Sequence, residues 1–191
     1  MTVIPPPLAE LLAYLAETRS RLVETATQMN PDFASIRPRS AAWSAAQNLD
    51  HLAKVEAGVA RMVEKSVEWA RSQGVGPSQS DESVMSSLDS YSVIEPPKPA
   101  TAPEMVAPAE DVTIEDSLES LRRSRERLLN ALNSSADLDL AGVTRPLLAH
   151  GELNMYQWGL FVAQHEERHR RQIDRTMEEV TGRAAECAPI V

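Results

Sequence analysis

Hydrophobic residues repeat at the spacing of α-helices in four long stretches of the chain. Residues 7–29 carry leucines at positions 8, 11, 12 and 15, and Pro7 is suited to the first turn of a helix. The second stretch begins after Ser44, which forms a capping-box signature with Gln47, and continues to about residue 70. We find no convincing strand pattern in the sequence.

Residues 114–133 and 154–180 complete the set of predicted helices. Thr113 is suited to cap the third helix, whose apolar stripe consists of Leu118, Leu121, Leu128, Leu129 and Leu132. The fourth helix is expected to end at the Thr-Gly pair that follows it, with Gly182 at the C-cap. Four amphipathic helices of about 20–27 residues predict an all-α fold, a four-helix bundle.

Residues 71–112, between the second and third helices, have a different composition. They include six of the 13 prolines, at positions 77, 96, 97, 99, 103 and 108. A connection of roughly 40 residues is unusual inside a compact domain, so it is either a hinge between two domains or a long Pro-rich crossover between parallel helices. The crossover is favoured because two helices on one side of a hinge would have little core of their own. We therefore expect a single domain over residues 1–191.

Composition and charge narrow the classes of function. The net charge of -9, from 28 acidic and 19 basic residues, argues against nucleic-acid binding, which depends on lysine and arginine. The single cysteine, Cys187, cannot form an internal disulfide, which favours a cytoplasmic protein. We expect neither secretion nor a membrane partner, because no signal-like N-terminus and no apolar run of about 18 residues is present.

The candidate chemistry lies in the run "VAQHEERHRRQI" of the fourth helix. His165 and His169 lie roughly 40° apart around the helix, within its apolar stripe. His51 lies at the edge of the stripe of the second helix, so packing of the two helices would let three imidazoles meet. Three neutral imidazoles suit Zn²⁺, Ni²⁺, Cu²⁺ or Fe²⁺ and leave coordination positions open, as in catalytic sites. The alternative is that these are hydrogen-bonded core histidines.

The same run also fits the His-Glu-x-x-His template of zinc metallopeptidases, as "HEERH". In that interpretation Glu166 is the general base, and a third ligand comes from downstream of the helix. Only 22 residues follow His169, and no strand is predicted to align a peptide substrate. The metallopeptidase interpretation is therefore the less favoured one.

Three segments together resemble the DinB/YfiT-like superfamily of metal-dependent enzymes, and the resemblance covers nearly the whole chain. They are "WSAAQNLDHLAKVE", "VAPAEDVTIEDSLESLRRSRERLLNAL" and "LLAHGELNMYQWGLFVAQHEERHRRQI". The resemblance implies a bundle in up-down-down-up order, often a homodimer, that holds a divalent zinc or nickel ion. Carried over by position, the metal ligands fall on His51, His165 and His169.

Further residues are candidates for the substrate pocket or for support of the metal ligands. His150 precedes the fourth helix, Glu166 is placed to accept a bond from an imidazole, and Trp43 and Trp158 could line a pocket. Glu56 is expected to be a helix-packing neighbour. No catalytic residue is assigned.

The preferred function is a metal-dependent enzyme that activates water or a thiol, for hydrolysis or thiol transfer on a small-molecule substrate. A low-molecular-weight thiol is one expected partner. The alternative functions are a non-catalytic metal-binding or stress-related bundle and a purely structural helical dimer.

Overall fold

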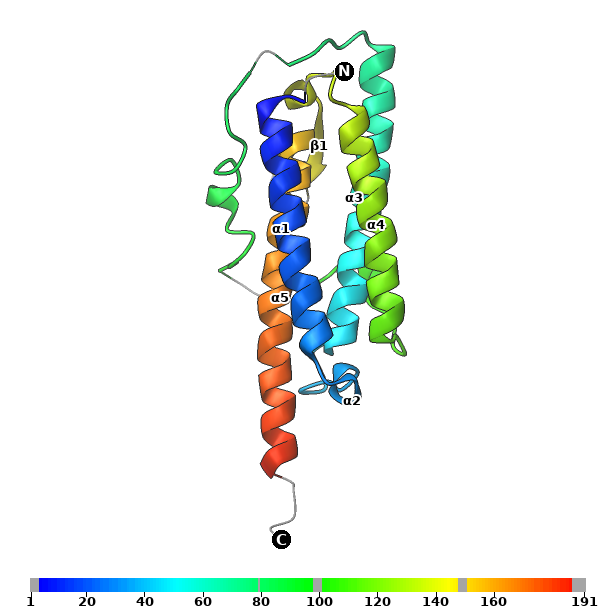
Figure 1. The fold of residues 1–191 in the computed structure, drawn as a ribbon, viewed down its shortest axis with the longest axis vertical. Helices are drawn as coiled ribbons and strands as arrows, with labels where there is room; N and C mark the ends of the chain where they lie inside the picture. The colour runs from blue at the N-terminus through cyan, green and yellow to red at the C-terminus, as the bar shows by residue number, and fades with distance from the viewer. Residues whose placement is uncertain (1–3, 79, 98–100, 148–150, 187–191) are drawn as a thin grey trace.

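Four long helices pack side by side in the computed structural model, which describes residues 4–78, 80–97, 101–147 and 151–186. They are α1 (Pro6–Gln28), α3 (Ala45–Ser72), α4 (Ile114–Ser134) and α5 (Met155–Glu186), and a single-turn helix α2 (Pro31–Ala34) follows α1 (Figure 1). The predicted four-helix bundle is confirmed. Within the described residues, no helix is both long and apolar enough to cross a bilayer.

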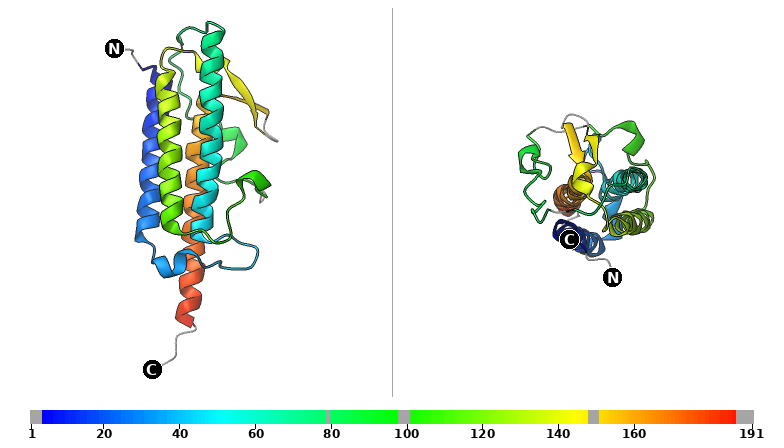
Figure 2. Two further views of the ribbon diagram at one scale, coloured as in Figure 1. Left: turned by 90° about the vertical axis from the view of Figure 1, so that its right-hand side faces the viewer. Right: turned by 90° about the horizontal axis from the view of Figure 1, so that it is seen from above.

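The helices run in up-down-down-up order. Figure 1 shows α1 and α5 pointing one way and α3 and α4 pointing the other. Viewed along the bundle axis, α1 lies beside α5 and α3 lies beside α4, and α3 also packs against α5 (Figure 2). The expectation that the second and third long helices are parallel is confirmed.

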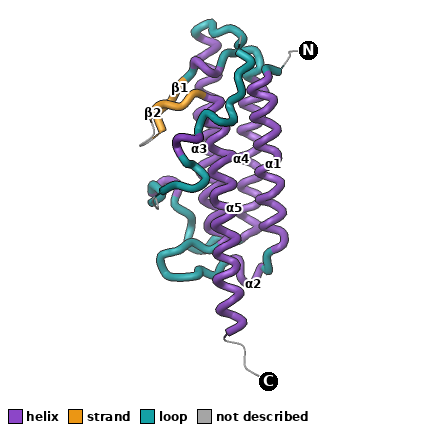
Figure 3. The backbone as a smooth tube through the Cα atoms, turned by 90° about the vertical axis from the view of Figure 1, so that its left-hand side faces the viewer, coloured by secondary structure: helices purple, strands orange, loops and turns teal. Residues whose placement is uncertain are grey.

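The connection from α3 to α4 returns the chain along the outside of the bundle (Figure 3). Its described parts contain two short 3-10 helices, η1 (Asp89–Tyr91) and η2 (Glu104–Val106). Arg171 of α5 makes an ion pair of 2.5 Å with Glu95 of this connection. The connection therefore lies against α5 and covers part of its outer face.

The caps predicted for two helices are present. The side chain of Ser44 accepts a bond from the backbone N–H of Gln47, and the Gln47 side chain accepts one from the Ser44 backbone, which completes the capping box. Thr113 caps α4 by accepting a bond from the N–H of Asp116. These local bonds explain why both helices begin where the sequence predicts.

The predicted end of the last helix is wrong. The helix α5 does not stop at Gly182 but continues to Glu186. Gly182 does not adopt the positive φ of a C-cap glycine, and a helical glycine costs only about 1 kcal/mol relative to alanine. Arg183 donates to the carbonyl of Pro38, so a tertiary contact holds the added turn.

The expectation of no strands is also wrong. Strands β1 (Thr144–Leu147) and β2 (Gly151–Asn154) form an antiparallel hairpin beside the start of α5. Each strand has four residues, too few to show an alternating pattern, and β1 contains a proline. Tertiary contacts hold the hairpin. Leu153 is fully buried, and the indole N–H of Trp158 donates a hydrogen bond to the carbonyl of Arg145.

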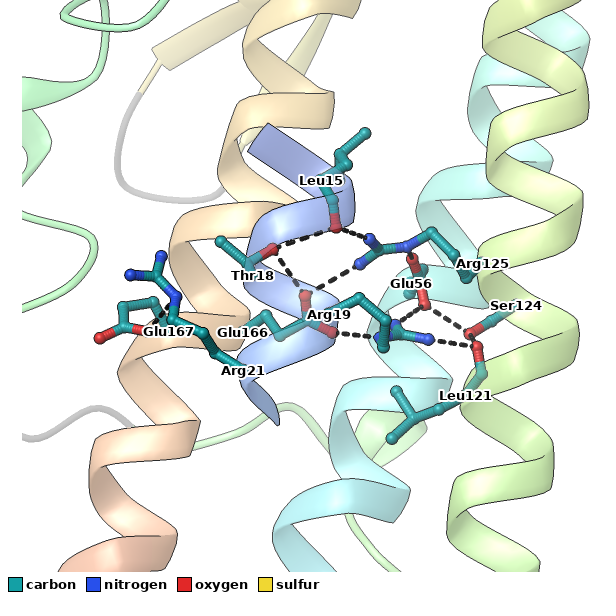
Figure 4. A network of polar contacts seen from close by, with 10 residues as sticks. All are labelled: Leu15, Thr18, Arg19, Arg21, Glu56, Leu121, Ser124, Arg125, Glu166 and Glu167. Atoms are coloured by element: carbon teal, nitrogen blue, oxygen red, sulfur yellow. Dashed lines mark hydrogen bonds and ion pairs between the residues drawn. The ribbon is translucent and has the colours of Figure 1, made fainter. Parts of the chain in front are cut away.

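A layer of buried charge separates two apolar clusters inside the bundle. One cluster includes Leu15 of α1 and Leu128 of α4, and the other includes Leu22 and Leu121 of the same helices. Between them, one ionic side chain from each long helix joins a single network (Figure 4): Arg19, Glu56, Arg125 and Glu166. Two guanidinium groups thus meet two carboxylates, and the layer is balanced in charge.

Candidate metal centre

Three histidines from two helices meet in the interior. His51 comes from α3, and His165 and His169 lie one turn apart on α5. The side chains are 5%, 8% and 4% exposed, and one ring nitrogen of each lies within 4.8 Å of the others. The three residues that the sequence suggested as metal ligands are therefore brought together, and they could hold a metal ion.

The spacing of the ring nitrogens suits coordination. The Nε2 atoms of His165 and His169 are 3.2 Å apart. Two nitrogens that bind one tetrahedral zinc ion at its usual bond length are about 3.2–3.4 Å apart. The centroid of the His51 ring lies 5.3 Å from that of His165 and 4.9 Å from that of His169. All three rings thus surround one small volume.

Two of the rings are oriented by bonds on their far side. His51 Nδ1 lies 2.8 Å from the carbonyl oxygen of Val106, and His169 Nδ1 lies 2.8 Å from Oδ1 of Asn48. A carbonyl oxygen only accepts, so each Nδ1 carries the proton and each Nε2 keeps its lone pair. Hydrogen bonds of this kind hold metal-binding imidazoles in the coordinating tautomer.

Residues near the start of α3 position the groups that orient His169 and His51. The Nδ2 group of the fully buried Asn48 donates to the carbonyl of Ser44 at 2.9 Å, which leaves its Oδ1 facing His169. Lys54 donates to the carbonyl of Ala107 at 2.8 Å, and Asp50 accepts from the N–H of Ala109 at 2.8 Å. The same helix therefore fixes the segment whose carbonyl orients His51.

All three imidazoles are held neutral. Burial lowers the pKa of His165 to about 3, helped by the nearby His51 and by the charge of Arg168. Burial likewise lowers the pKa of His169 well below its usual range. The pKa of His51 is also lowered by burial, although its bond to the Val106 carbonyl opposes the shift. Neutral imidazoles with free lone pairs are the form that binds a metal ion.

Aromatic rings cover the histidines. Trp43, just before α3, lies with its ring centroid 4.8 Å from that of His51 and 6.2 Å from that of His169. Phe161 stacks on His165 at 5.3 Å with an interplanar angle of 13°. Our sequence analysis missed Phe161, although its position four residues before His165 on the same helix was the signal that could have found it.

The proposed role of Glu166 beside the histidines is wrong. Its Oε1 accepts from Arg19 at 2.6 Å, and its Oε2 accepts from Thr18 at 2.8 Å and from Arg125 at 3.0 Å. The side chain leaves α5 about 100° from His165 and so faces α1 and α4. Both oxygens are occupied by cationic or hydroxyl donors, so the group cannot serve as the general base of the metallopeptidase interpretation.

The other candidates are placed differently from the three histidines. Trp158 is buried, anchors the hairpin and contacts Phe161 edge-on at 5.6 Å, so it lies behind the ring that covers His165. Glu56 belongs to the charged layer, as expected for a helix-packing neighbour. His150 lies outside the described residues.

Comparison with known proteins agrees with this architecture. The crystal structure of TT2238, described as a four-helix bundle protein, aligns with a TM-score of 0.60 and 22% identity, over 88% of this chain and 98% of that one. That likeness supports the shared fold. A search of curated proteins finds no match. The sequence profile of the DinB superfamily matches residues 14–173, a region that contains all three clustered histidines. The chain therefore belongs to the DinB superfamily.

Proposed function

We propose that this protein is a metal-dependent enzyme whose divalent ion, zinc or nickel, is held by His51, His165 and His169. The observation that carries the proposal is the convergence of three buried, neutral imidazoles, two of them oriented by oxygen acceptors. A purely structural cluster would not need two imidazoles whose Nδ1 protons are held by oxygen acceptors, so that their Nε2 lone pairs are left for a metal ion. Histidine ligands of this number favour zinc or nickel over magnesium or calcium, which prefer oxygen.

The reaction class is hydrolysis or thiol transfer on a small molecule. When bound, the ion supplies Lewis-acid polarisation and lowers the pKa of water or of a thiol at its open position. The chain contributes a water-poor surrounding, because Trp43 and Phe161 cover the imidazole faces. Asn48 and the Val106 carbonyl keep the rings in one tautomer and one orientation.

Elemental analysis of the purified protein tests the proposal. We expect about one zinc or nickel ion per chain, and none in a variant that combines His51→Ala, His165→Ala and His169→Ala. His150→Ala is the matched control, since it removes the remaining histidine and should leave the metal content unchanged. A parent protein that contains no metal and takes up no added zinc or nickel would refute the metal site.

Activity screening separates the enzyme from the alternative. The metal-loaded parent and the triple variant are compared on ester, amide and thiol-transfer substrates. Turnover in the parent alone supports an enzyme. Stoichiometric metal without turnover on any of these substrates supports the non-catalytic metal-binding alternative.

A further inference from the structure

A hollow lined with arginines lies between α5 and the α3–α4 connection. We call it the arginine groove, and its volume is about 360 Å³. One wall is formed by Ile94, Glu95 and Pro96 of the α3–α4 connection. The other wall is formed by α5 residues Arg168, Arg171, Gln172 and Arg175, which repeat at helical spacing along one face. The groove carries three guanidinium groups and one carboxylate, so it has an excess of positive charge.

Two of these arginines have no carboxylate partner among the residues that the structure describes. Arg171 is neutralised, because it pairs with Glu95 at 2.5 Å and with Glu167 at 2.9 Å. Neither Arg168 nor Arg175 makes an ion pair with any residue that the structure describes. Arg168 is half-buried, so its guanidinium has lost part of its hydration without a compensating charge. An unpaired, half-buried guanidinium is suited to bind an oxyanion.

The position of Arg168 connects the groove to the histidines. It directly precedes His169 in α5 and lies about 60° around the helix from His165. Its positive charge acts on the rings of all three histidines of the cluster. An anionic group bound at Arg168 therefore lies within electrostatic range of the three proposed metal ligands.

We propose that the arginine groove binds the carboxylate or phosphate group of the substrate, with Arg168 as its main contact and Gln172 and Arg175 as further donors. Glu95 lies on the opposite wall, has a side chain that is 78% exposed, and competes for the same positive charge. Exposed ion pairs of this kind are weak, so an incoming anion can replace Glu95. The identification of this anion with the substrate rests on the proposed metal-dependent function, whereas the anion site itself does not.

The test is an NMR titration of the metal-free protein, in which no ion can bind the anion directly. Sodium phosphate and sodium succinate are added separately, at an ionic strength held constant with sodium chloride. We expect saturable shifts of the backbone amides of Ile94 and Glu95 and of residues 168–175. The anion with the lower Kd shows whether the groove prefers phosphate or carboxylate.

Two opposite substitutions make the test specific. Arg168→Gln should raise the Kd about 10-fold, because it removes a charge-assisted contact. Glu95→Gln should lower the Kd, because it removes the competing carboxylate. The matched controls are Arg61→Gln, an exposed arginine on α3, and Glu82→Gln, an exposed glutamate of the same connection, and both should leave the Kd within about twofold of the parent.

The possible outcomes separate the two proposals. Shifts that do not saturate, or that are the same in Arg168→Gln and the parent, would overturn the anion site while leaving the metal site standing. Saturable binding in a protein that takes up no metal would keep the anion site and overturn its assignment to the substrate. The metal content of Arg168→Gln is measured in parallel and should equal that of the parent.

Discussion

Removal of one charge from the buried layer should destabilise the fold strongly without affecting metal binding. In the variant Glu166→Gln, the carboxylate that accepts from Thr18, Arg19 and Arg125 is lost. The layer then contains two guanidinium groups and only Glu56, whose side chain is 2% exposed. An unpaired charge is left in the interior.

The magnitude follows from the burial of the partners. The side chains of Arg19 and Arg125 are only 14% and 8% exposed, so water cannot replace the lost carboxylate. Breaking a buried ion pair by removing one partner typically costs about 3–5 kcal/mol. With a urea m-value of ~2 kcal/mol per molar, the unfolding midpoint should fall by about 2 M.

Urea denaturation followed by circular dichroism measures this shift, and zinc uptake is measured on the same samples. The control is Glu64→Gln, which removes the carboxylate partner of Arg127 at the surface and should barely change the midpoint. If Glu166→Gln lowers the free energy of unfolding by less than about 1 kcal/mol, the charged layer does not stabilise the fold as we propose. Loss of zinc with unchanged stability would instead indicate a role for Glu166 at the metal, as in a metallopeptidase.

Three further predictions concern the histidine cluster and the assembly. Asn48→Leu should weaken zinc affinity about 10–100-fold in a chelator competition, because His169 loses its hydrogen-bond acceptor. Asn48→Asp keeps an acceptor oxygen and should bind zinc more tightly than Asn48→Leu. In the metal-free protein, burial lowers the pKa of His165 to about 3 from an ordinary 6.5. As the pH is lowered from about 6.5 to about 5, His165 takes up a proton in the unfolded chain but not in the folded chain, so the free energy of unfolding should decrease. Urea titrations at each pH should show a shallower fall in the triple histidine variant. Light scattering should give twice the chain mass of 21.0 kDa if the protein is a homodimer, as the family resemblance implies, and a monomer mass at micromolar concentration would contradict it.

The local features of the fold were readable from the sequence because they depend on neighbours in the chain. The capping box at Ser44 and the cap at Thr113 are formed by residues three positions apart, and both helices begin as predicted. The missed features depend on distant contacts. The hairpin is too short for a pattern of its own, and the last turn of α5 is held by a bond from Arg183 to Pro38, 145 positions away.

Some features of the candidate site were likewise predictable from the sequence, and others depend on distant contacts. The spacing of His165 and His169 placed them on one face of a helix, and His51 was identifiable on the edge of another apolar stripe. Their meeting requires α3 and α5 to pack in one register, and the orienting groups Asn48 and Val106 come from 121 and 55 positions away from the rings they contact. Contacts between residues so far apart produce no periodic pattern in the sequence, so they could not be predicted from it.

The sequence by itself therefore determined the four helices and the residue types able to bind a metal, since periodicity and side-chain chemistry are properties of short segments. Only the tertiary structure decided what each polar side chain faces. Glu166 and His165 are adjacent in the chain, yet one joins a buried layer of arginines and the other joins the histidine cluster. The physical reason is that successive residues of a helix point about 100° apart and therefore face different neighbours. The charges and hydrogen-bonding groups of those neighbours determine what each side chain does.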